Sequence, residues 1–551
     1  MNKRKLRIGL LLDSNFVYAW QYAALERLIK SGVAEFCVLI LQQDKTIVES
    51  KIKKLTRYRK IWVYSVFQKI DHLFFAGKPN AFAERNIHDL FPEISKINIL
   101  SVHEKGRITF STPDIEKISA YRLDILVKMG SDDLIGNLFK SAKFGIWTYY
   151  HDDIRTFDKS RMKSWAIKNY WPETGSTLQI LKGEHEHIVI YRSWSLAYIS
   201  PEKTRNEHHW LSVSFLTRQV ELLYSSGEEK FFQLVKKYQS DTDMNFIVTN
   251  KFPSNFESLK LLINYLLRSS IKVFQKLFLN EQWFLLFDRN DKLAGSIDNF
   301  RKIVPPKDRY WADPHIIEES GKHYIFVEEL PYSTRRGHIA VIEMNPDGKL
   351  SESVTLLKYP YHLSYPCVFH YDDTYYMIPE SSENQTVCLY ECKEFPYRWE
   401  LKMNLLENIA AADTTPFFYN NKWWLFTNVA ENEGSSLCDE LFIFYADTLF
   451  TGNWTPHPLN PVISDLKRSR PAGRIFIRDG RIYRPSQNGS VTYGYALNIN
   501  EILVLSESEY LEKRVESIVP DWDSAVKATH TFTSEGDFKI IDALHFRRKY
   551  F

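Results

Sequence analysis

Apolar and polar positions repeat in a fixed frame through the second half of the chain. From Asp313, an apolar run leads through a polar turn to Tyr324, and a second apolar run ends at Glu328. The same frame fits four later starts: Tyr365, Asp413, Ala472 and, in a poorer copy, about Ala528. The starts are 48 to 59 residues apart, and a unit of about 50 residues is the length of a four-stranded blade. The pattern therefore predicts an all-β five-bladed β-propeller over residues 282–551, with Trp283 to Phe287 as a strand that opens or closes it.

The first part of the chain, residues 1–205, has a different pattern. Short apolar runs at 7–12 and 36–41 flank a helical pattern at 18–29, which is typical of a β-α-β unit with a buried parallel sheet. A further strand is expected at 123–129, a helix at 132–140, and a strand at 145–150 that ends at His151. We expect an α/β, Rossmann-like domain, although no glycine-rich phosphate loop follows any strand.

Residues 206–281 are mostly helical in pattern and predict a helical linker region. Within it, residues 256–279 place apolar side chains at helical spacing, with basic residues and no acid between Ser258 and Asn280. Two interpretations stay open. The helix lies on an anionic membrane surface, or its apolar face packs against a domain, which is the commoner fate. Peripheral membrane contact through 256–279 is thus a candidate interaction.

Composition narrows the classes of function. The formal net charge is +3, and no dense stripe of Lys and Arg is present, so we expect no nucleic-acid partner. Five scattered cysteines favour a reducing compartment over a disulfide framework or a zinc site. The first apolar run is cut by Asp13 before it reaches signal-peptide length, and no apolar stretch approaches a membrane span. We expect a cytoplasmic protein, with membrane-peripheral attachment as the alternative.

Three motifs of the first part resemble a known family. Asp124-Ile-Leu-Val-Lys-Met-Gly130, Phe144-Gly-Ile-Trp-Thr-Tyr-Tyr-His151 and Trp171-Pro-Glu-Thr-Gly-Ser-Thr-Leu178 are similar to the catalytic domain of methionyl-tRNA formyltransferase and related sugar formyltransferases. The resemblance implies a formyltransferase-like fold with His151 as the catalytic histidine. Tyr149 stands where the family has asparagine, so we expect this domain to have lost folate-dependent formyl transfer. A metal site is one interpretation of a second group: His151, Asp152, Asp153, His185 and His187. A polar strand at the surface is the stronger interpretation, so we predict no metal site.

A second resemblance covers about residues 283–551. It is carried by Tyr310-Trp-Ala-Asp-Pro314, His362-Leu-Ser-Tyr-Pro366, Ile378-Pro-Glu380, Ala411-Ala-Asp413, Arg470-Pro-Ala-Gly-Arg474 and Thr529-His-Thr531. These motifs resemble the propeller domain of the glucosamine inositolphosphorylceramide transferase family. They are more distantly similar to five-bladed arabinanase, xylosidase and invertase propellers.

The repeat frame predicts where a site lies. The innermost strand of each blade begins at the central channel, so Asp313 and Asp413 are expected at one mouth of it. Chemistry on a glycosidic bond needs one protonated and one ionised carboxyl group. We assign Asp313 by its match to the blade-one aspartate of the propeller glycosidases, Glu380 as the acid and Asp413 as the modulator. Candidate substrate-binding residues are Trp311, Glu328, Glu329, His362, Tyr365, Arg470, Arg474 and His530. The competing interpretation is that these groups are turns, caps and blade core.

Together the patterns indicate a carbohydrate-active protein of surface-glycan or glycolipid assembly, with a carbohydrate or sugar-nucleotide ligand in the propeller channel. Transfer and hydrolysis stay open, and no cofactor is predicted. One alternative is a glycan-binding or scaffolding protein whose formyltransferase-like domain has lost its chemistry. Another is a formyltransferase acting on an amino-sugar nucleotide.

Overall fold

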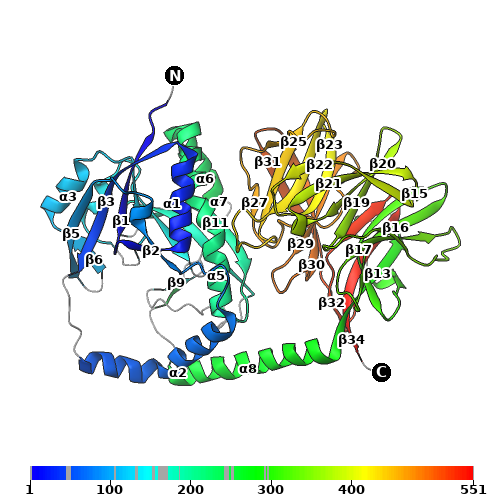
Figure 1. Ribbon diagram of the computed structural model, residues 1–551, viewed down its shortest axis with the longest axis horizontal. Helices are drawn as coiled ribbons and strands as arrows, with labels where there is room; N and C mark the ends of the chain where they lie inside the picture. The colour runs from blue at the N-terminus through cyan, green and yellow to red at the C-terminus, as the bar shows by residue number, and fades with distance from the viewer. Residues whose placement is uncertain are drawn as a thin grey trace. The chain divides into compact units, whose positions relative to one another are not determined.

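The computed structural model describes residues 3–44, 51–104, 107–130, 134–151, 156–158, 172–184, 186–240, 247–249, 254–290, 293 and 297–549. The chain divides into two compact units. Unit 1 comprises residues 1–267 with 432–435, and unit 2 comprises 268–431 with 436–551. Figure 1 shows the α/β unit in blue to green and the β-rich unit in green to red.

Unit 1 is built on an eight-stranded mixed sheet with the order β11-β10-β8-β7-β1-β3-β5-β6. The five central strands β8, β7, β1, β3 and β5 are parallel, whereas β6, β10 and β11 run antiparallel to their neighbours. The strand bounds are β1 Leu6–Leu12, β3 Ala34–Asp44, β5 Lys96–Glu104, β6 Arg107–Phe110, β7 Ile125–Lys128, β8 Ile146–His151, β10 Glu173–Leu181 and β11 His187–Leu196. Two small pairs stand apart from this sheet: β2 Phe16–Tyr18 with β4 Glu84–Asn86, and β9 Thr156–Asp158 with β12 Ile247–Thr249.

Helices cover both faces of this sheet because its central strands are apolar on both sides. In β1, Ile8, Leu10 and Leu12 enter one core with helices α1, α6 and α7, whereas Leu11 enters the other core with α3 and η2. The bounds are α1 Ala19–Ser31, α2 Lys51–Phe75, α3 Thr112–Ser119, η2 Asn137–Lys140, α5 Pro201–Leu211, α6 Val213–Ser226, α7 Glu228–Ser240 and α8 Asn255–Phe278, with a short η1 at Ile87–Asp89.

Most elements expected for this unit are present, and three expectations need correction. The helix expected at 132–140 is wrong over the described part, where only the single turn η2 forms after Gly136 at φ 89°. Helix α2 has no counterpart among the predicted elements. Residues 206–267 form no separate linker, because α6 and α7 bury Phe215, Val220 and Phe231 in the core of unit 1.

Unit 2 is a five-bladed β-propeller, which confirms the predicted architecture. Blade 1 comprises β15 Arg309–Glu319, β16 Lys322–Pro331, β17 His338–Met344 and β18 Val354–Leu357. Blade 2 comprises β19 Ser364–Tyr371, β20 Thr374–Glu380, β21 Thr386–Glu394 and β22 Arg398–Glu407. Blade 3 comprises β23 Ala411–Tyr419, β24 Lys422–Val429, β25 Glu440–Ala446 and β26 Thr455–Pro456, and β27 Ile463–Ser464 also pairs with β25. Blade 4 comprises β28 Phe476–Arg478, β29 Arg481–Asn488, β30 Ala496–Leu505 and β31 Tyr510–Ile518.

Blade 5 joins two distant parts of the chain. Its strands are β33 Phe532–Glu535, β34 Phe538–Arg548, β13 Leu279–Arg289 and β14 Arg301–Ile303, and β32 Val526–Ala528 also pairs with β34. β13 pairs with β34 over its whole length, from Leu279 opposite Arg548 to Arg289 opposite Phe538. The strand expected at 283–287 is thus confirmed as the one that closes the ring (Figure 1).

The inner strands of the first three blades share an irregularity. Each has a bulge at the same point of the frame, and the residue there is left-handed: Asp313 at φ 51°, Tyr365 at φ 44° and Asp413 at φ 52°. This conformation is uncommon for residues other than glycine and costs of the order of 1–3 kcal/mol. Such strain is found where a side chain has to be aimed at a site, and it singles out the predicted mouth of the channel.

None of the helices within the described ranges is both long and apolar enough to span a bilayer. All five cysteines are free of disulfide bonds.

Candidate functional site

A cluster of carboxyl groups lies where the inner strands of the blades begin. In each hairpin, the end of the second strand returns to the beginning of the first, so that Ala312 pairs with Glu328 and Ser364 pairs with Glu380. The frame therefore brings Asp313, Glu328, Glu380 and Asp413 to the same end of the propeller. All four are buried or nearly so.

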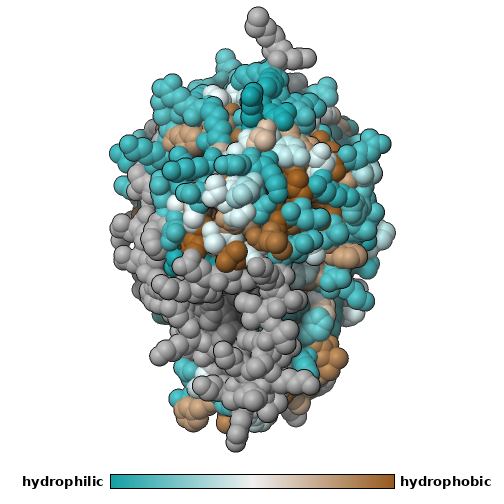
Figure 2. Space-filling view, turned by 90° about the vertical axis from the view of Figure 1, so that its left-hand side faces the viewer, coloured by the Kyte–Doolittle hydropathy of each residue, from teal (hydrophilic) through white to brown (hydrophobic). Residues whose placement is uncertain are grey.

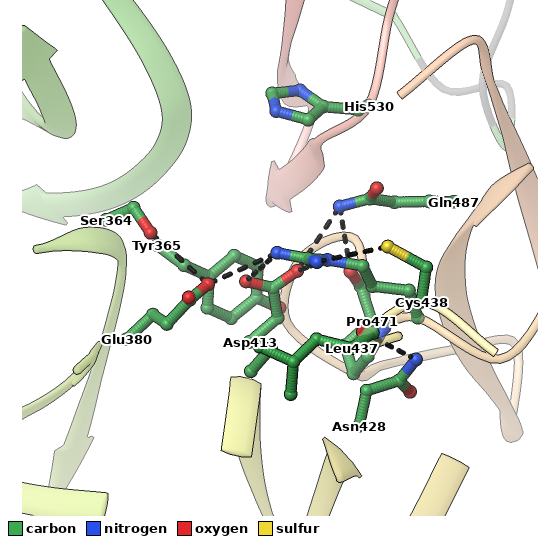
Figure 3. Close-up of polar contacts among 12 residues, drawn as sticks. Ser364, Tyr365, Glu380, Asp413, Asn428, Leu437, Cys438, Pro471, Gln487 and His530 are labelled. Carbon is green, nitrogen blue, oxygen red and sulfur yellow. Dashed lines mark hydrogen bonds and ion pairs between the residues drawn. The ribbon is translucent and has the colours of Figure 1, made fainter. Parts of the chain in front are cut away.

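Arg470 joins two of these carboxyl groups across three blades. Its Nε lies 2.6 Å from Asp413 Oδ2, and its Nη2 lies 3.3 Å from Asp413 Oδ1 and 3.2 Å from Glu380 Oε2. Gln487 Nε2 donates a further hydrogen bond to Asp413 Oδ2 at 3.2 Å. Figure 3 shows these contacts converging on Asp413, with Glu380 on one side and Gln487 on the other.

Arg470 is the shared counter-ion of two buried carboxyl groups, Asp413 and Glu380, and the pKa values of these two groups shift in opposite directions. Burial raises the pKa of Asp413 well above its usual range, since the Glu380 charge beside it offsets the attraction of Arg470. Burial alone would raise the pKa of Glu380 too. The Arg470 guanidinium and hydrogen bonds from Asp413 and Ser382 instead hold that pKa below its usual value. Glu380 is therefore ionised, which does not fit the predicted role of acid.

Glu328 has the properties of the protonated partner. Burial, with Asp313 nearby, raises the pKa of Glu328 well above its usual range. Its Oε1 accepts a hydrogen bond from Tyr310 OH at 3.1 Å and lies 3.3 Å from His362 Nε2. His362 Nδ1 accepts from the N–H of Gly337, so Nε2 carries the hydrogen and donates to Glu328 as a neutral imidazole. A Cβ at Gly337 would lie 2.6 Å from Glu328 Oε1, so this approach requires glycine.

Asp313 is held by two other blades, blade 2 and blade 5. Its Oδ2 accepts from the N–H of Tyr365 at 3.2 Å, and its Oδ1 accepts from Thr531 Oγ1 at 2.7 Å. His530 Nε2 lies 3.5 Å from Oδ1. Burial raises the pKa of Asp313, whereas the His530 cation and the Thr531 hydroxyl oppose that rise. Of the carboxyl groups at this end, Asp313 and Glu328 thus both have a raised pKa, and the rise at Asp313 is opposed by the His530 cation.

His530 lies between two carboxylates. Its Nδ1 forms a close ion pair with Asp542 Oδ2 at 2.6 Å, and its ring stacks on Trp283 at 4.2 Å. Burial alone would lower its pKa, but Asp542 and Asp313 raise the pKa of His530 to about 9. Ligand atoms of Asp313, His530 and Asp542 all lie within 4.8 Å of one another, close enough to hold a metal ion. The imidazolium already neutralises this group, so a cation has to displace its proton.

Several of the predicted substrate-binding residues make their contacts away from the carboxyl cluster. Glu329 accepts from Trp311 Nε1 and Ser353 Oγ and pairs with Arg309 and His338, apart from the cluster. Trp311 lies in the hydrophobic core shared with blade 5. Tyr365 is fully buried, with its hydroxyl bonded to Thr415 Oγ1 and to the N–H of Gly473.

The buried rings of Trp311 and Tyr365 therefore present no face for a sugar. Arg474 binds Glu535 and the carbonyl oxygen atoms of Ile316 and Val368, within the interior rather than at the carboxyl cluster.

Two residues of the cluster have no signal in the repeat frame. Asp542 lies on β34 and accepts from the N–H groups of Asp313, His530 and Thr531. Tyr493 lies in the turn between β29 and β30, and 47% of it is exposed. Its ring lies 5.1 Å from the Arg470 guanidinium carbon and 5.9 Å from the His530 ring. An exposed ring beside buried charges is the natural surface for a sugar face. In the sequence, the consecutive residues Tyr493 and Gly494 in a turn are only a weak signal for a ring that stacks on a sugar.

The predicted histidine of unit 1 is buried. The ring of His151 stacks on His209 at 3.9 Å and on Tyr149 at 5.5 Å, and its Nδ1 lies 3.3 Å from Ser176 Oγ. Burial, with His208 and Arg205 nearby, lowers the pKa of His151 to about 3. Among the described residues its Nε2 has no hydrogen-bond partner. Asp152, Asp153 and His185 of the metal interpretation lie outside the described residues.

The chain is similar to known proteins over its propeller. Residues 303–535 match the family "Glucosamine inositolphosphorylceramide transferase 1, N-terminal". Glucosamine inositolphosphorylceramide transferase 1 of Oryza sativa subsp. japonica is 33% identical over 204 residues, which is 36% of this chain and 27% of that protein. The Arabidopsis thaliana protein of the same name is 32% identical over 210 residues, 37% of this chain and 27% of that protein. The matches thus span about a quarter of the length of these relatives, and they confirm the predicted resemblance of the second part.

Among solved structures, a family 117 glycoside hydrolase of Zobellia galactanivorans aligns with 48% of this chain and 91% of its own at 11% identity and a TM-score of 0.32.

Proposed function

We propose that the protein acts on carbohydrate in glycolipid or surface-glycan assembly, with its sugar site at the carboxyl cluster of the propeller. The observation that supports this most is that Glu328, whose pKa lies well above its usual range, and Asp313, which accepts hydrogen bonds beside the His530 cation, lie at the same end of the blades as a candidate acid and its ionised partner. Burial raises the pKa of Glu328, whereas Asp313 is bound by donors and a cation. Chemistry at a glycosidic bond needs such a pair.

The relatives support the substrate class. Their name, glucosamine inositolphosphorylceramide transferase, joins an amino sugar to a ceramide lipid, and a lipid that carries a sugar is a glycolipid. The part of this chain that matches them, residues 303–535, contains all the carboxyl groups of the cluster except Asp542.

In this proposal Glu328 is the general acid and Asp313 the ionised partner. The Glu380–Arg470 ion pair, with Asp413 hydrogen-bonded between the two, orients sugar hydroxyl groups, and the half-exposed ring of Tyr493 stacks on a sugar face. The proposal extends to a cytoplasmic setting, supported by five cysteines that form no disulfide.

For unit 1 we propose a formyltransferase-like fold that has lost formyl transfer. The order of its parallel strands and the position of His151 at the end of β8 support the fold, and Tyr149 in the asparagine position supports the loss. If the propeller binds glycans without turning them over, the protein is a glycan-binding scaffold, which is the alternative.

The test is a thermal-shift screen of the full chain against sugar nucleotides and oligosaccharides, since a ligand of the folded state raises Tm. Each ligand that raises Tm is then tested on Glu328→Gln and Asp313→Asn, with Asp447→Asn, an exposed aspartate of blade 3, as the matched control. We expect both cluster variants to lose the Tm shift or the turnover and the control to keep them. A ligand whose shift and turnover survive both cluster variants would place the site elsewhere.

A further inference from the structure

Helix α8 exposes an apolar face along its whole length. Ten large apolar side chains on this helix are each about half exposed: Phe256, Leu259, Ile263, Leu266, Leu267, Ile271, Val273, Phe274, Leu277 and Phe278. At 3.6 residues per turn they fall within a sector of roughly 160°. Solvent-exposed sectors of this size are rare on folded proteins unless something binds them.

The opposite side of α8 is the side that packs. Leu261 and Tyr265 are buried against Tyr64 and Phe67 of α2, and Tyr265 OH donates to Asp71 Oδ1 at 3.2 Å. Because these contacts use the far side of the helix, α2 cannot cover the exposed apolar sector.

Charge indicates the chemistry of the occupant. Lys260, Arg268, Lys272 and Lys276 lie on α8, and no Asp or Glu occurs between Ser258 and Asn280. A helix with an apolar face, basic residues on its polar side and a single acid, Glu257 in its first turn, fits a surface that is apolar below and anionic above, which is the headgroup region of an anionic bilayer.

Helix α2 has a second apolar surface, which lies on the side of α2 away from α8 because Tyr64 and Phe67 form the contact between the two helices. Trp62, Val66, Leu73 and Phe74 are exposed on it, and its sequence contains seven Lys or Arg residues against one acid, the buried Asp71. Figure 2 shows brown apolar areas near the lower end of the molecule, where Figure 1 places α2. An exposed tryptophan is the residue most suited to the membrane interface.

We infer that α8 docks on the anionic surface of a lipid bilayer. The helix lies parallel to the surface, with its apolar sector among the acyl chains and its lysines at the phosphate groups. This inference is independent of the proposed sugar site, because none of its residues belongs to the carboxyl cluster.

The test is co-sedimentation of the full chain with vesicles of phosphatidylcholine alone or mixed with phosphatidylglycerol. We expect binding to the mixed vesicles and much weaker binding to the neutral ones. Leu267→Glu with Phe274→Glu should weaken binding to mixed vesicles at least about tenfold, because two half-buried side chains leave the acyl region. Lys272→Gln and Lys276→Gln should each weaken it by about fivefold and leave neutral vesicles unaffected.

Leu503→Glu, at an equally exposed position on β30, is the matched control and should bind as the native chain does. Circular dichroism and Tm verify that each variant is folded. The inference is overturned if the chain does not sediment with mixed vesicles, or if the double variant binds them as well as the control. Two further results would also overturn it. Loss of self-association in the double variant without vesicle binding assigns the face to a second copy, and a large fall in Tm without vesicle binding assigns it to packing within the protein.

Discussion

The guanidinium of Arg470 holds Asp413 at 2.6 Å, although the two residues belong to neighbouring blades and are far apart in sequence. The same side chain reaches Glu380 in the blade before. The charge balance at the mouth of the propeller therefore depends on one buried cation.

Replacing Arg470 by Met should destabilise unit 2 strongly. Two buried carboxyl groups would lose their counter-ion, and breaking a buried pair from one side costs about 3–5 kcal/mol of the free energy of unfolding. Equilibrium unfolding in urea measures this loss. Arg481→Met, at an exposed arginine of blade 4, should change it by less than about 1 kcal/mol. Adding Asp413→Asn and Glu380→Gln to Arg470→Met should restore much of the loss; no recovery would contradict the proposed charge balance.

His530 should make the stability of unit 2 fall in mildly alkaline solution. Its pKa is raised from 6.5 to about 9 in the folded state, so its contribution is complete below about pH 6.5 and is lost as the pH rises through about 9. The loss amounts to about 3 kcal/mol at most. The measurement is the free energy of unfolding between pH 6 and pH 10, compared with His530→Gln. Parallel curves for the two proteins would show that Asp542 and Asp313 do not hold the imidazolium.

Unit 1 should not transfer a formyl group from a folate. In the proposed formyltransferase-like fold, Tyr149 stands at the position of the asparagine that polarises the formyl oxygen, and losing one preorganised donor costs roughly 10² to 10³ in rate. The measurement is chromatographic detection of formylated amino-sugar nucleotide after incubation with formyltetrahydrofolate. Product that disappears in His151→Ala would refute this prediction.

Limited proteolysis should separate the two units before it cuts the blades. We expect the first cleavage between about residues 255 and 282, because the chain passes from one compact unit to the other within α8. Mass spectrometry of the early fragments identifies the cut. An initial cut between β15 and β31 would contradict the prediction.

How far the sequence predicts the site differs from residue to residue. The repeat frame identifies Asp313 and Asp413, because both hold the same left-handed position in their blades. It also leads to Glu328 and Glu380, since each ends a second strand. Which of these two carries the proton depends on burial and Asp313, which raise the pKa of Glu328, and on Arg470 of another blade, which lowers the pKa of Glu380. Spacing does not reveal such partners. Asp542 and Tyr493 lie outside the frame, on the closing blade and in a turn.

The closure of blade 5 also bears on how the protein is made. β13 pairs early with β14, but its other partner β34 ends at Arg548, so the edge of β13 that faces β34 stays unpaired while the four intervening blades are synthesised. Chains fold domain by domain as they leave the ribosome, from the N-terminus onward. Unit 1 has its core residues available halfway through translation, whereas the propeller can form its ring only when β34 has emerged. Throughout that interval the apolar edge of β13 is open to pairing with other chains, and a chaperone that shields it would raise the yield of the native protein.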